Sequence, residues 1–466
     1  MIRDGKAAGW LQLPAEALLP WAMLSGVAFH SVVPGTAVGR GGALLASEEL
    51  SSCTDHGASV ALMTVPRDLI LSLERVLEHA KVDKDFREVL NGLGEFGRAL
   101  PLELLPTFWT LNELQLLVGT TLAPAVSSKL RSLQREYEML CQSASQTRWY
   151  GVVRDHLDFD DWLQVDAMYR SRALDFPGIG HCMVPCIDLA NHSPGESTIA
   201  IYEKDDDGNA VLILRDDKTV TEGEEVTITY GDAKGACEML FSYGFLEPDR
   251  LSAETLFLSL TIPDNDYYKS AKSQVAECAP GFKLVDARDG GIEWSGEFIW
   301  LLCVGEDDGL RFELAKTVDG GEEMHAFFRD QELTGGAVGL YDMLGKSELW
   351  DVYRLRAIAV LQQRVFDQLQ VLYSMQDGVE AVSHGEGTGI RDGQYEQAMQ
   401  LRRLEFELLE QAYEDFERQK LELAQSEVVG RYLAQVNGSS THAPDEEGVV
   451  AASASDEQEA AEEDFS

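Results

Sequence analysis

A run of polar residues follows an apolar, strand-like segment near the middle of the chain. Residues 184–193 read Val-Pro-Cys-Ile-Asp-Leu-Ala-Asn-His-Ser, which groups Asp188, Asn191, His192 and Ser193 together. Carboxylate, amide and imidazole groups placed directly after a buried strand lie where ligand sites often form. The same residue types also cap turns and helices, and taken alone this cluster favours that structural role.

Two Tyr-Gly pairs lie downstream of this cluster. Residues 223–232 read Gly-Glu-Glu-Val-Thr-Ile-Thr-Tyr-Gly-Asp, and residues 238–246 read Glu-Met-Leu-Phe-Ser-Tyr-Gly-Phe-Leu. Each pair, at Tyr230 and at Tyr243, is an ordinary turn or core element when taken alone. The ordered occurrence of a strand, Asp-x-x-Asn-His-Ser, a hairpin and the two Tyr-Gly pairs within about 65 residues is more specific than any one part.

Short strand-like segments lie on both sides of the polar cluster. They are apolar or alternating, and turn residues separate them, including Asp207-Gly208 between two hairpin strands. A Gly-rich turn at residues 39–42 precedes the first of them. We expect strands at residues 43–46, 61–65, 183–187, 198–202, 210–214 and 226–230.

Helical periodicity separates the two strand-rich parts and dominates the rest of the chain. Apolar residues recur three or four apart at 112–118 and 130–140, and again over 349–376 and 392–424. Residues 441–466 contain nine acidic residues and no Lys or Arg, so they cannot bury enough apolar surface to fold alone.

The predicted fold class is α+β. A β-rich domain is split by a helical insert, and a mainly α-helical domain and a disordered acidic tail follow it. The expected segments are 15–73 and 171–250 for the two parts of the β-rich domain, 74–170 for the insert, 251–430 for the helical domain and 431–466 for the tail.

The composition constrains the partners. The 466 residues include 80 acidic and 38 basic ones, giving a formal net charge of −42, which repels nucleic acid and anionic membranes and attracts basic protein segments. No apolar run approaches the roughly 20 residues of a membrane span. We expect an intracellular protein, cytoplasmic or nuclear or both, that acts as a monomer on a basic protein and uses no nucleic acid or membrane.

The seven cysteines are scattered along the chain and form a poor disulfide framework. The tightest spacing, between Cys182 and Cys186, lacks the second ligand pair of a structural zinc site. No metal is predicted.

The ordered motifs resemble the SET domain, and within that superfamily the class of the Rubisco large-subunit lysine methyltransferase, which includes fungal ribosomal-protein and animal non-histone methyltransferases. The resemblance covers roughly residues 15–250. Besides the central motifs, the segments that carry it are Leu18-Leu-Pro-Trp21 with Ser25-Gly26, the Gly-rich turn and strand at 39–46, Val65-Pro66, the helical insert from Phe108-Trp109 to Glu136-Tyr137, and Ser171-Arg-Ala173.

This resemblance implies an S-adenosylmethionine-dependent protein-lysine N-methyltransferase. Its substrate would be a non-histone and basic protein such as a ribosomal protein, and residues 251–430 would be substrate-binding in character. Tyr243 would be the catalytic tyrosine, whose hydroxyl orients the amine, and Tyr230 would be a second wall of the methyl-transfer channel. The residues implied to bind or support the cofactor are Asn191, His192, Arg172, Asp188, Gly41, Gly42 and Phe245.

Two features of the sequence keep other interpretations open. Residues 232–238, Asp-Ala-Lys-Gly-Ala-Cys-Glu, depart from the class, which often has an Asn before the last motif. Arg172 also has a competing role as a buried structural partner of Asp188. The alternatives are a catalytically degenerate SET domain that binds basic peptides, an acidic scaffold or chaperone for basic proteins, and an enzyme of the same class that methylates histidine.

Overall fold

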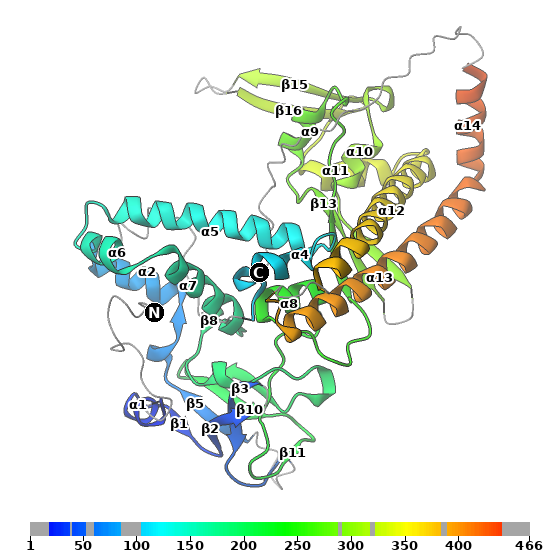
Figure 1. Cartoon of the computed structure of the whole chain (residues 1–466). Helices are drawn as coiled ribbons and strands as arrows, with labels where there is room; N and C mark the ends of the chain where they lie inside the picture. Colours follow the sequence, from blue (N-terminus) through cyan, green and yellow to red (C-terminus); the bar gives the residue numbers. More distant parts are fainter. Residues whose placement is uncertain are drawn as a thin grey trace. The chain divides into compact units, whose positions relative to one another are not determined.

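The computed structural model describes residues 18–37, 40–52, 60–84, 104–287, 291–316, 322–383 and 389–439. The chain forms two compact units, whose elements are labelled in Figure 1. The first unit comprises Met1–Phe108, Lys129–Lys234 and Ser242–Gly244, and the second comprises Trp109–Ser128, Gly235–Phe241 and Phe245–Ser466. Within the described ranges no helix has both the length and the apolar character that a membrane crossing requires.

Short antiparallel strands form the framework of the first unit. Their bounds are β1 Ala28–Phe29, β2 Val32–Ala37, β3 Gly41–Ala46, β4 Leu50–Ser51, β5 Ala61–Val65, β6 Leu71–Ser72, β7 Leu174–Phe176, β8 Gly180–Met183, β9 Ala200–Lys204, β10 Ala210–Leu214 and β11 Thr219–Val220. One sheet has the order β1-β5-β10-β9, and smaller sheets pair β2 with β3, β4 with β11, and β8 with both β6 and β7.

The apolar residues of these strands meet in one core. Leu62 and Met63 of β5, Leu212 of β10 and Leu44 of β3 are fully buried and belong to the same cluster. Burying a side chain of this size stabilises the fold by about 1.5–3 kcal/mol. Gly41 and Gly42, predicted to lie in a Gly-rich turn, are instead the first two residues of β3, and the buried residues that follow them in this strand hold them in place.

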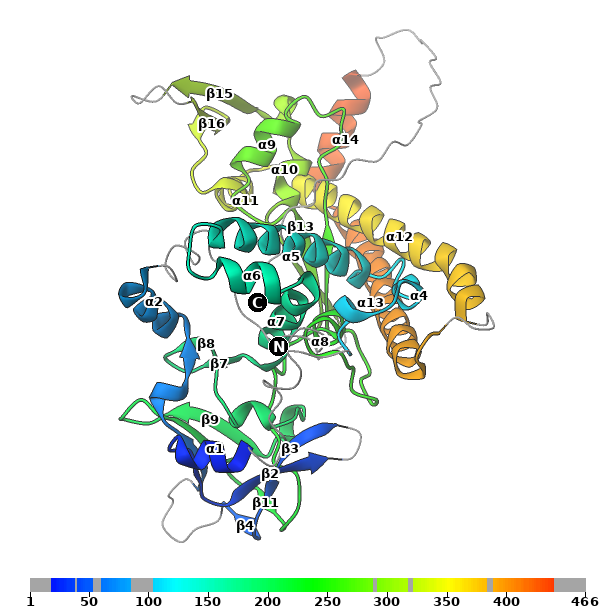
Figure 2. The same ribbon diagram turned by 60° about the vertical axis from the view of Figure 1, so that its left-hand side comes forward.

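Helices occupy the sequence between the two strand-rich parts. Leu140, Val153 and Trp162, from α5, α6 and α7, pack in one cluster, and Figure 2 shows these helices close together. Asp158 begins α7 with a capping box, because its side chain accepts from the Asp161 amide while Asp161 accepts from the Asp158 amide. The α-helices with described residues in this unit are α1 Leu18–Leu24, α2 Leu73–Val82, α5 Leu122–Ala144 from Lys129 onward, α6 Tyr150–His156, α7 Phe159–Arg172 and the last two residues of α8 Ala236–Tyr243.

Three predicted strands are wrong in detail. The strand predicted at 198–202 is β9, which instead runs from Ala200 to Lys204. The strand predicted at 183–187 ends at Met183, because Cys186 adopts a left-handed φ of 72° and a 3₁₀ turn, η4, follows at Ile187–Leu189. Residues 226–230 form no regular strand. They lie in a segment with only isolated bridges, from Glu225 to Leu45 and from Ile228 to His192, because the partner of Ile228 is a loop.

The second unit contains two three-stranded antiparallel sheets in addition to its helices. The sheets have the orders β12-β13-β14 and β15-β16-β17, with bounds β12 Thr255–Ser259, β13 Gly281–Asp286, β14 Ile292–Ser295, β15 Leu310–Lys316, β16 Glu322–Phe328 and β17 Gln331–Glu332. The predicted helical domain did not include them, since these strands are short and only partly apolar. The unit is thus α+β as well.

Two long helices, α12 Trp350–Ser383 and α13 Asp392–Ala424, lie side by side (Figure 1). Ala398, Leu401, Leu408, Ala412 and Phe416 of α13 are buried at spacings of three, four and seven residues, which is the period of one helix face. The remaining helices that have residues in this unit are α4 Leu111–Gln115, α8 Ala236–Tyr243, α9 Lys269–Val275, α10 Ile299–Cys303, α11 Gly336–Gly345 and α14 Glu427–Ser439.

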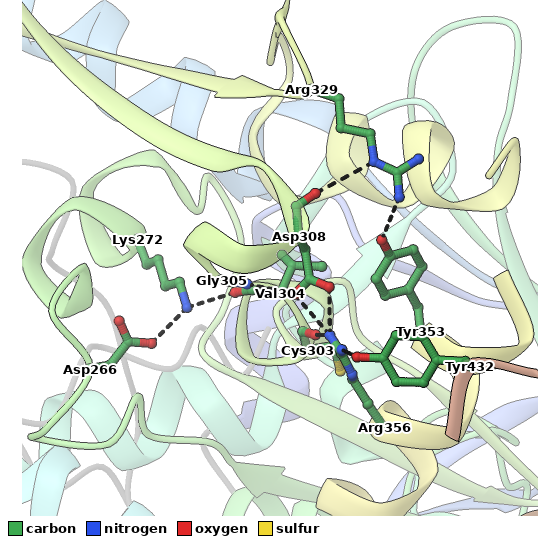
Figure 3. Close-up of polar contacts among 10 residues, drawn as sticks. All are labelled: Asp266, Lys272, Cys303, Val304, Gly305, Asp308, Arg329, Tyr353, Arg356 and Tyr432. Carbon is green, nitrogen blue, oxygen red and sulfur yellow. Dashed lines mark hydrogen bonds and ion pairs between the residues drawn. The ribbon is translucent and has the colours of Figure 1, made fainter. Parts of the chain in front are cut away.

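The helix α14 corrects the predicted start of the tail. Disorder was expected from residue 431, but residues 427–439 are helical. Val429 is buried, and the Tyr432 hydroxyl accepts a hydrogen bond of 2.8 Å from Arg356 of α12 (Figure 3). These contacts give the segment the apolar burial and partners that its composition alone does not suggest. Residues 440–466 lie outside the described residues.

Candidate active site

The segment from Glu224 to Ile228 brings the two motif regions together. On one side its backbone is bonded to β3, with the Val226 amide donating to the Leu44 carbonyl at 2.8 Å. On the other side the Ile228 amide donates to the Asn191 carbonyl at 3.0 Å, and its carbonyl accepts from the Ser193 amide at 3.0 Å. The Asn-His loop is therefore fixed beside the end of the segment that leads to Tyr230.

The Asn-His loop begins in a strained turn. Cys186 is buried and holds the left-handed backbone, which is unusual for a residue with a side chain. The next turn, η4, carries Asp188, whose carbonyl and carboxylate accept from Arg172 at 3.1 and 3.3 Å. Burial raises the pKa of Asp188, and the Arg172 guanidinium opposes that rise. Arg172 thus makes the contact expected of a structural partner of Asp188.

Glu225, which was not among the predicted site residues, orients the Asn191 side chain. Its amide nitrogen donates to the Gly42 carbonyl at 3.1 Å and to Glu225 Oε1 at 2.7 Å. Both amide hydrogens are used in this way, which leaves Oδ1 as the acceptor of this side chain. The arrangement ties the Gly-rich turn, the Asn-His loop and residue 225 to one another.

Arg40 completes this network. Its guanidinium donates to Glu225 Oε2 at 3.4 Å and to the His192 carbonyl at 3.3 Å. Neither Arg40 nor Glu225 was among the predicted site residues. The signal that could have found them is that each directly adjoins a motif, since Arg40 precedes Gly41 and Glu225 belongs to the Glu-Glu-Val-x-Ile-x-Tyr-Gly run.

The backbone amide of Tyr230 holds the His192 side chain in place. Its imidazole is 6% exposed, and Nδ1 accepts from the Tyr230 backbone amide at 3.1 Å. In the neutral ring the proton therefore resides on Nε2. The His192 and Tyr230 rings are 5.3 Å apart between centroids, so the histidine supports the tyrosine.

Tyr230 and Tyr243 form an aromatic pair. Their ring centroids are 4.6 Å apart with an angle of 32° between planes, and the Tyr243 hydroxyl donates to the Tyr230 carbonyl at 3.4 Å. The Tyr230 hydroxyl donates to the Ala190 carbonyl at 3.1 Å. Burial raises the pKa of Tyr230 to about 12, so its phenol stays protonated at neutral pH.

Gly244 places Tyr243 at this position. Its φ is +80°, and a Cβ built on it would lie 2.8 Å from the Leu104 backbone carbon and Cβ. Only glycine permits both the left-handed backbone and this close approach. Lys234 lies over the Tyr243 ring, with Nζ 5.9 Å from the centroid.

The stretch that departs from the class is anchored at Asp232. Its Oδ1 accepts from the Gly195 amide at 3.0 Å and from the Thr229 hydroxyl at 2.8 Å. The Gly195 hydrogen bond is the main cause that lowers the pKa of Asp232. This segment is therefore linked to the loop that follows the Asn-His motif.

The structure brings most of the predicted site residues together in the first unit. Asn191 contacts Gly42, Arg172 contacts Asp188, and His192, Tyr230 and Tyr243 form a row of rings. Gly41 is exposed with a φ of +79° and no atom within 4 Å of an added Cβ. Phe245 belongs to the second unit, so its role at the cofactor remains a prediction.

Comparison with known proteins identifies the class. The chain is 28% identical over 322 residues to SET domain-containing protein 8 of Schizosaccharomyces pombe, which covers 68% of this chain and 72% of that protein. It is 30% identical over 192 residues to the chloroplastic ribulose-1,5-bisphosphate carboxylase/oxygenase large subunit N-methyltransferase of Pisum sativum, covering 38% of each. No family model matches the chain.

Solved structures show the same fold. The structure of Rubisco LSMT bound to AdoMet superposes with a TM-score of 0.61 at 19% identity, covering 93% of this chain and 98% of that one. The SET domain of LSMT bound to lysine and AdoHcy superposes with a TM-score of 0.59, covering 92% and 96%. Together, the sequence similarity, the shared fold and the ordered Asn-His and Tyr-Gly-Phe motifs support a SET-domain methyltransferase of the Rubisco large-subunit methyltransferase class.

Proposed function

We propose that this enzyme transfers the methyl group of S-adenosylmethionine to a lysine amine in a basic, non-histone protein such as a ribosomal protein. The observation that carries the proposal is the pairing of Tyr243 with Tyr230 directly beside His192 and Asn191. Structures with the same fold support it, because Rubisco LSMT has been solved bound to AdoMet, and the LSMT SET domain has been solved bound to lysine and AdoHcy.

The residues around Asn191 fit the methionine end of this cofactor. Asn191 Oδ1 is an acceptor suited to an ammonium group, because both hydrogens of its amide are bonded to Gly42 and Glu225. The open space beside the Gly41 Cα leaves room for a ligand against the backbone at the start of β3. The ion pair between Arg172 and Asp188 supports the Asn-His loop that carries Asn191.

When bound, S-adenosylmethionine supplies an electrophilic methyl group on a sulfonium. The tasks of the chain are then to align the amine with that group and to keep the amine neutral. A lysine has a pKa of about 10.4 in water, so deprotonation must be favoured at the site. Burial of the amine beside Tyr230 and Tyr243 would do this by removing the ammonium from water, and the positive charge of a bound sulfonium would disfavour the ammonium further.

Tyr243 orients the amine and Tyr230 supports it. The Tyr230 phenol is bonded to the Ala190 carbonyl and its pKa is about 12, so it cannot act as a base near neutral pH. The Tyr243 hydroxyl lies 3.4 Å from the Tyr230 carbonyl, a weak contact that an incoming amine can replace. Alignment of this kind contributes several kcal/mol in well-oriented systems.

The substrate class rests on charge. A net charge of −42 favours a basic partner over long range, which suits a ribosomal protein or another Lys-rich protein. The same charge disfavours nucleic acid as a partner. We propose that the enzyme acts in the cytoplasm or nucleus, where such proteins are made and assembled, and as a monomer.

Labelling in extracts tests the proposal. The protein is incubated with radiolabelled S-adenosylmethionine and a lysate from cells that lack it, and labelled proteins are identified by mass spectrometry. We expect methylated lysine in one or a few basic proteins with the wild type and loss of that label with Tyr243→Phe. Methylated histidine would change the acceptor, and equal labelling by both proteins would remove Tyr243 from its assigned role.

A further inference from the structure

A pocket lies in the second unit that no part of the methyl-transfer site uses. It has a volume of about 340 Å³, and β14, α10, α11 and α12 contribute most of its lining. Its walls hold a cluster of four large aromatic rings, Trp294, Trp300, Tyr341 and Trp350. Large aromatic side chains gathered around one hollow on a soluble protein are typical of ligand sites.

The four rings form one connected group around Trp300. Its ring centroid lies 5.1 Å from Trp350, 5.3 Å from Tyr341 and 6.0 Å from Trp294. Tyr341 meets Trp350 at 70°, close to perpendicular, with centroids 5.7 Å apart. Trp300 is buried and forms the floor, whereas Tyr341 is 42% exposed and reaches solvent at the rim.

The chemistry of the polar lining favours a cation. Glu297 lines the pocket, and within the described residues it has no cationic group at ion-pair distance. Arg354 is the positive residue of the lining, but its guanidinium lies 3.8 Å from Asp351 Oδ1, which offsets its charge. The hollow therefore offers aromatic faces and one uncompensated carboxylate, which is the combination that binds an ammonium or guanidinium group.

Hydrogen bonds between α12 and the end of α10 hold the pocket walls in place before a ligand binds. Arg356 of α12 donates to the Cys303 carbonyl at the end of α10 at 2.8 Å and to both carboxylate oxygens of Asp308 (Figure 3). This network fixes α10 against α12, and with them Trp300 and Trp350. A site whose walls need not reorganise binds a ligand at a lower entropic cost.

We propose that this pocket binds a lysine or arginine side chain of a basic protein segment. The aliphatic stem of the side chain packs on the Trp294, Tyr341 and Trp350 rings, and its charged end pairs with Glu297. Because the whole pocket belongs to the second unit, it recognises the partner through residues other than those that carry the reaction. The inference deepens the proposed function, since the segment would belong to the methylated protein.

Peptide binding tests the pocket without requiring methyl transfer. The probe is an acetylated and amidated peptide of alternating arginine and glycine, titrated into the full-length protein by calorimetry at low salt. A matched peptide with citrulline in place of arginine has nearly the same shape without the charge. We expect the arginine peptide to bind and the citrulline peptide to bind at least fivefold more weakly.

Matched variants locate the binding. Glu297→Gln and Tyr341→Ala are expected to weaken the arginine peptide about five- to thirtyfold, as loss of a partly desolvated cation site of about 1–2 kcal/mol implies. Glu293→Gln on β14 and Tyr373→Ala on α12 remove an exposed carboxylate and a 75% exposed ring outside the pocket, and should bind like the wild type. Unchanged thermal unfolding of Glu297→Gln excludes misfolding as the cause.

The outcomes separate this inference from the proposed function. Wild-type affinity in both pocket variants, or equal binding of the citrulline peptide, would contradict the proposal that this pocket binds a basic side chain, even if methyl transfer is intact. Tenfold tighter binding of a trimethyllysine peptide than of the unmodified lysine peptide would also overturn it, in favour of a site that reads methylated product. Loss of all labelling in lysates with peptide binding retained would instead reject the proposed function alone.

Discussion

The Asn191 side-chain amide donates a hydrogen bond of 2.7 Å to the carboxylate of Glu225, 34 residues further along the chain. This contact, together with the one to Gly42, sets which face of the Asn191 amide is left for a ligand. Glu225 is thus a positioning residue, because it acts through Asn191.

Glu225→Gln is expected to weaken S-adenosylmethionine binding about tenfold. Glutamine keeps an acceptor oxygen for the Asn191 amide, but that hydrogen bond is no longer to a charged group and the Arg40 ion pair is lost. Hydrogen bonds to charged groups contribute about 1.5–3 kcal/mol, against about 0.5–1.5 kcal/mol for neutral ones. Calorimetric titration of the cofactor measures the effect. The control is Glu222→Gln, an exposed carboxylate on the same segment; an equal loss in both variants would mean that general surface charge is responsible.

Tyr243→Phe is expected to lower kcat by roughly a hundredfold or more while cofactor affinity changes less than threefold, because mispositioning of a reacting group reduces rate strongly. The comparison is Tyr230→Phe, which should instead reduce stability by about 1 kcal/mol, since its hydroxyl is bonded to the Ala190 carbonyl. Steady-state kinetics with the unmethylated protein substrate, together with thermal unfolding, separate the two. A kcat unchanged in Tyr243→Phe would contradict the orientation role.

Gly244→Ala is expected to destabilise the protein by about 2–5 kcal/mol. The left-handed backbone disfavours a side chain by about 1–2 kcal/mol, and overpacking against Leu104 adds about 1–3 kcal/mol. Gly151→Ala, in the exposed helix α6 with nothing within 4 Å of the added Cβ, should be neutral or stabilising. Thermal melts of both variants decide the point, and equal shifts would show that the close approach at Leu104 has no consequence.

Stability of the second unit is expected to fall as the pH rises through neutrality because of Glu405. This residue is fully buried on α13 and accepts from the Thr121 amide at 2.9 Å. Burial raises its pKa from about 4.5 to about 7, so the folded state binds a proton that the unfolded state has already released. The free energy of unfolding is therefore highest below pH 4.5. It falls as the pH rises through 7, by about 3 kcal/mol in all.

Glu405→Gln should abolish this part of the pH dependence, because glutamine cannot ionise. Urea unfolding at pH 5 and pH 8 measures it, with the exposed Glu410→Gln on the same helix as the control. If Glu405→Gln lost as much stability between the two pH values as the wild type, another buried group would have to account for the change.

The local sequence was sufficient to locate most elements of the fold. Residues 61–65 and 210–214 are strands with the predicted bounds, and 392–424 is a helix with the predicted bounds, because each is a continuous or periodic apolar run. Predictions failed where the backbone departs from a regular period. Cys186 interrupts the predicted strand at 183–187 with a left-handed residue, and the short strands after residue 251 carry too few apolar residues to stand out.

By itself, the sequence determined the class that the protein resembles and the principal residues of its candidate site, because the chain carries Asp188, Asn191, His192, Tyr230 and Tyr243 in this order. Only the tertiary structure decided which other side chains hold these residues in position. Glu225 and Arg40 orient the Asn-His loop, and Trp294, Tyr341 and Trp350 surround a pocket, through contacts between residues far apart in sequence. Such contacts leave no periodic signal, since they depend on how strands and helices meet and not on the spacing within any one of them.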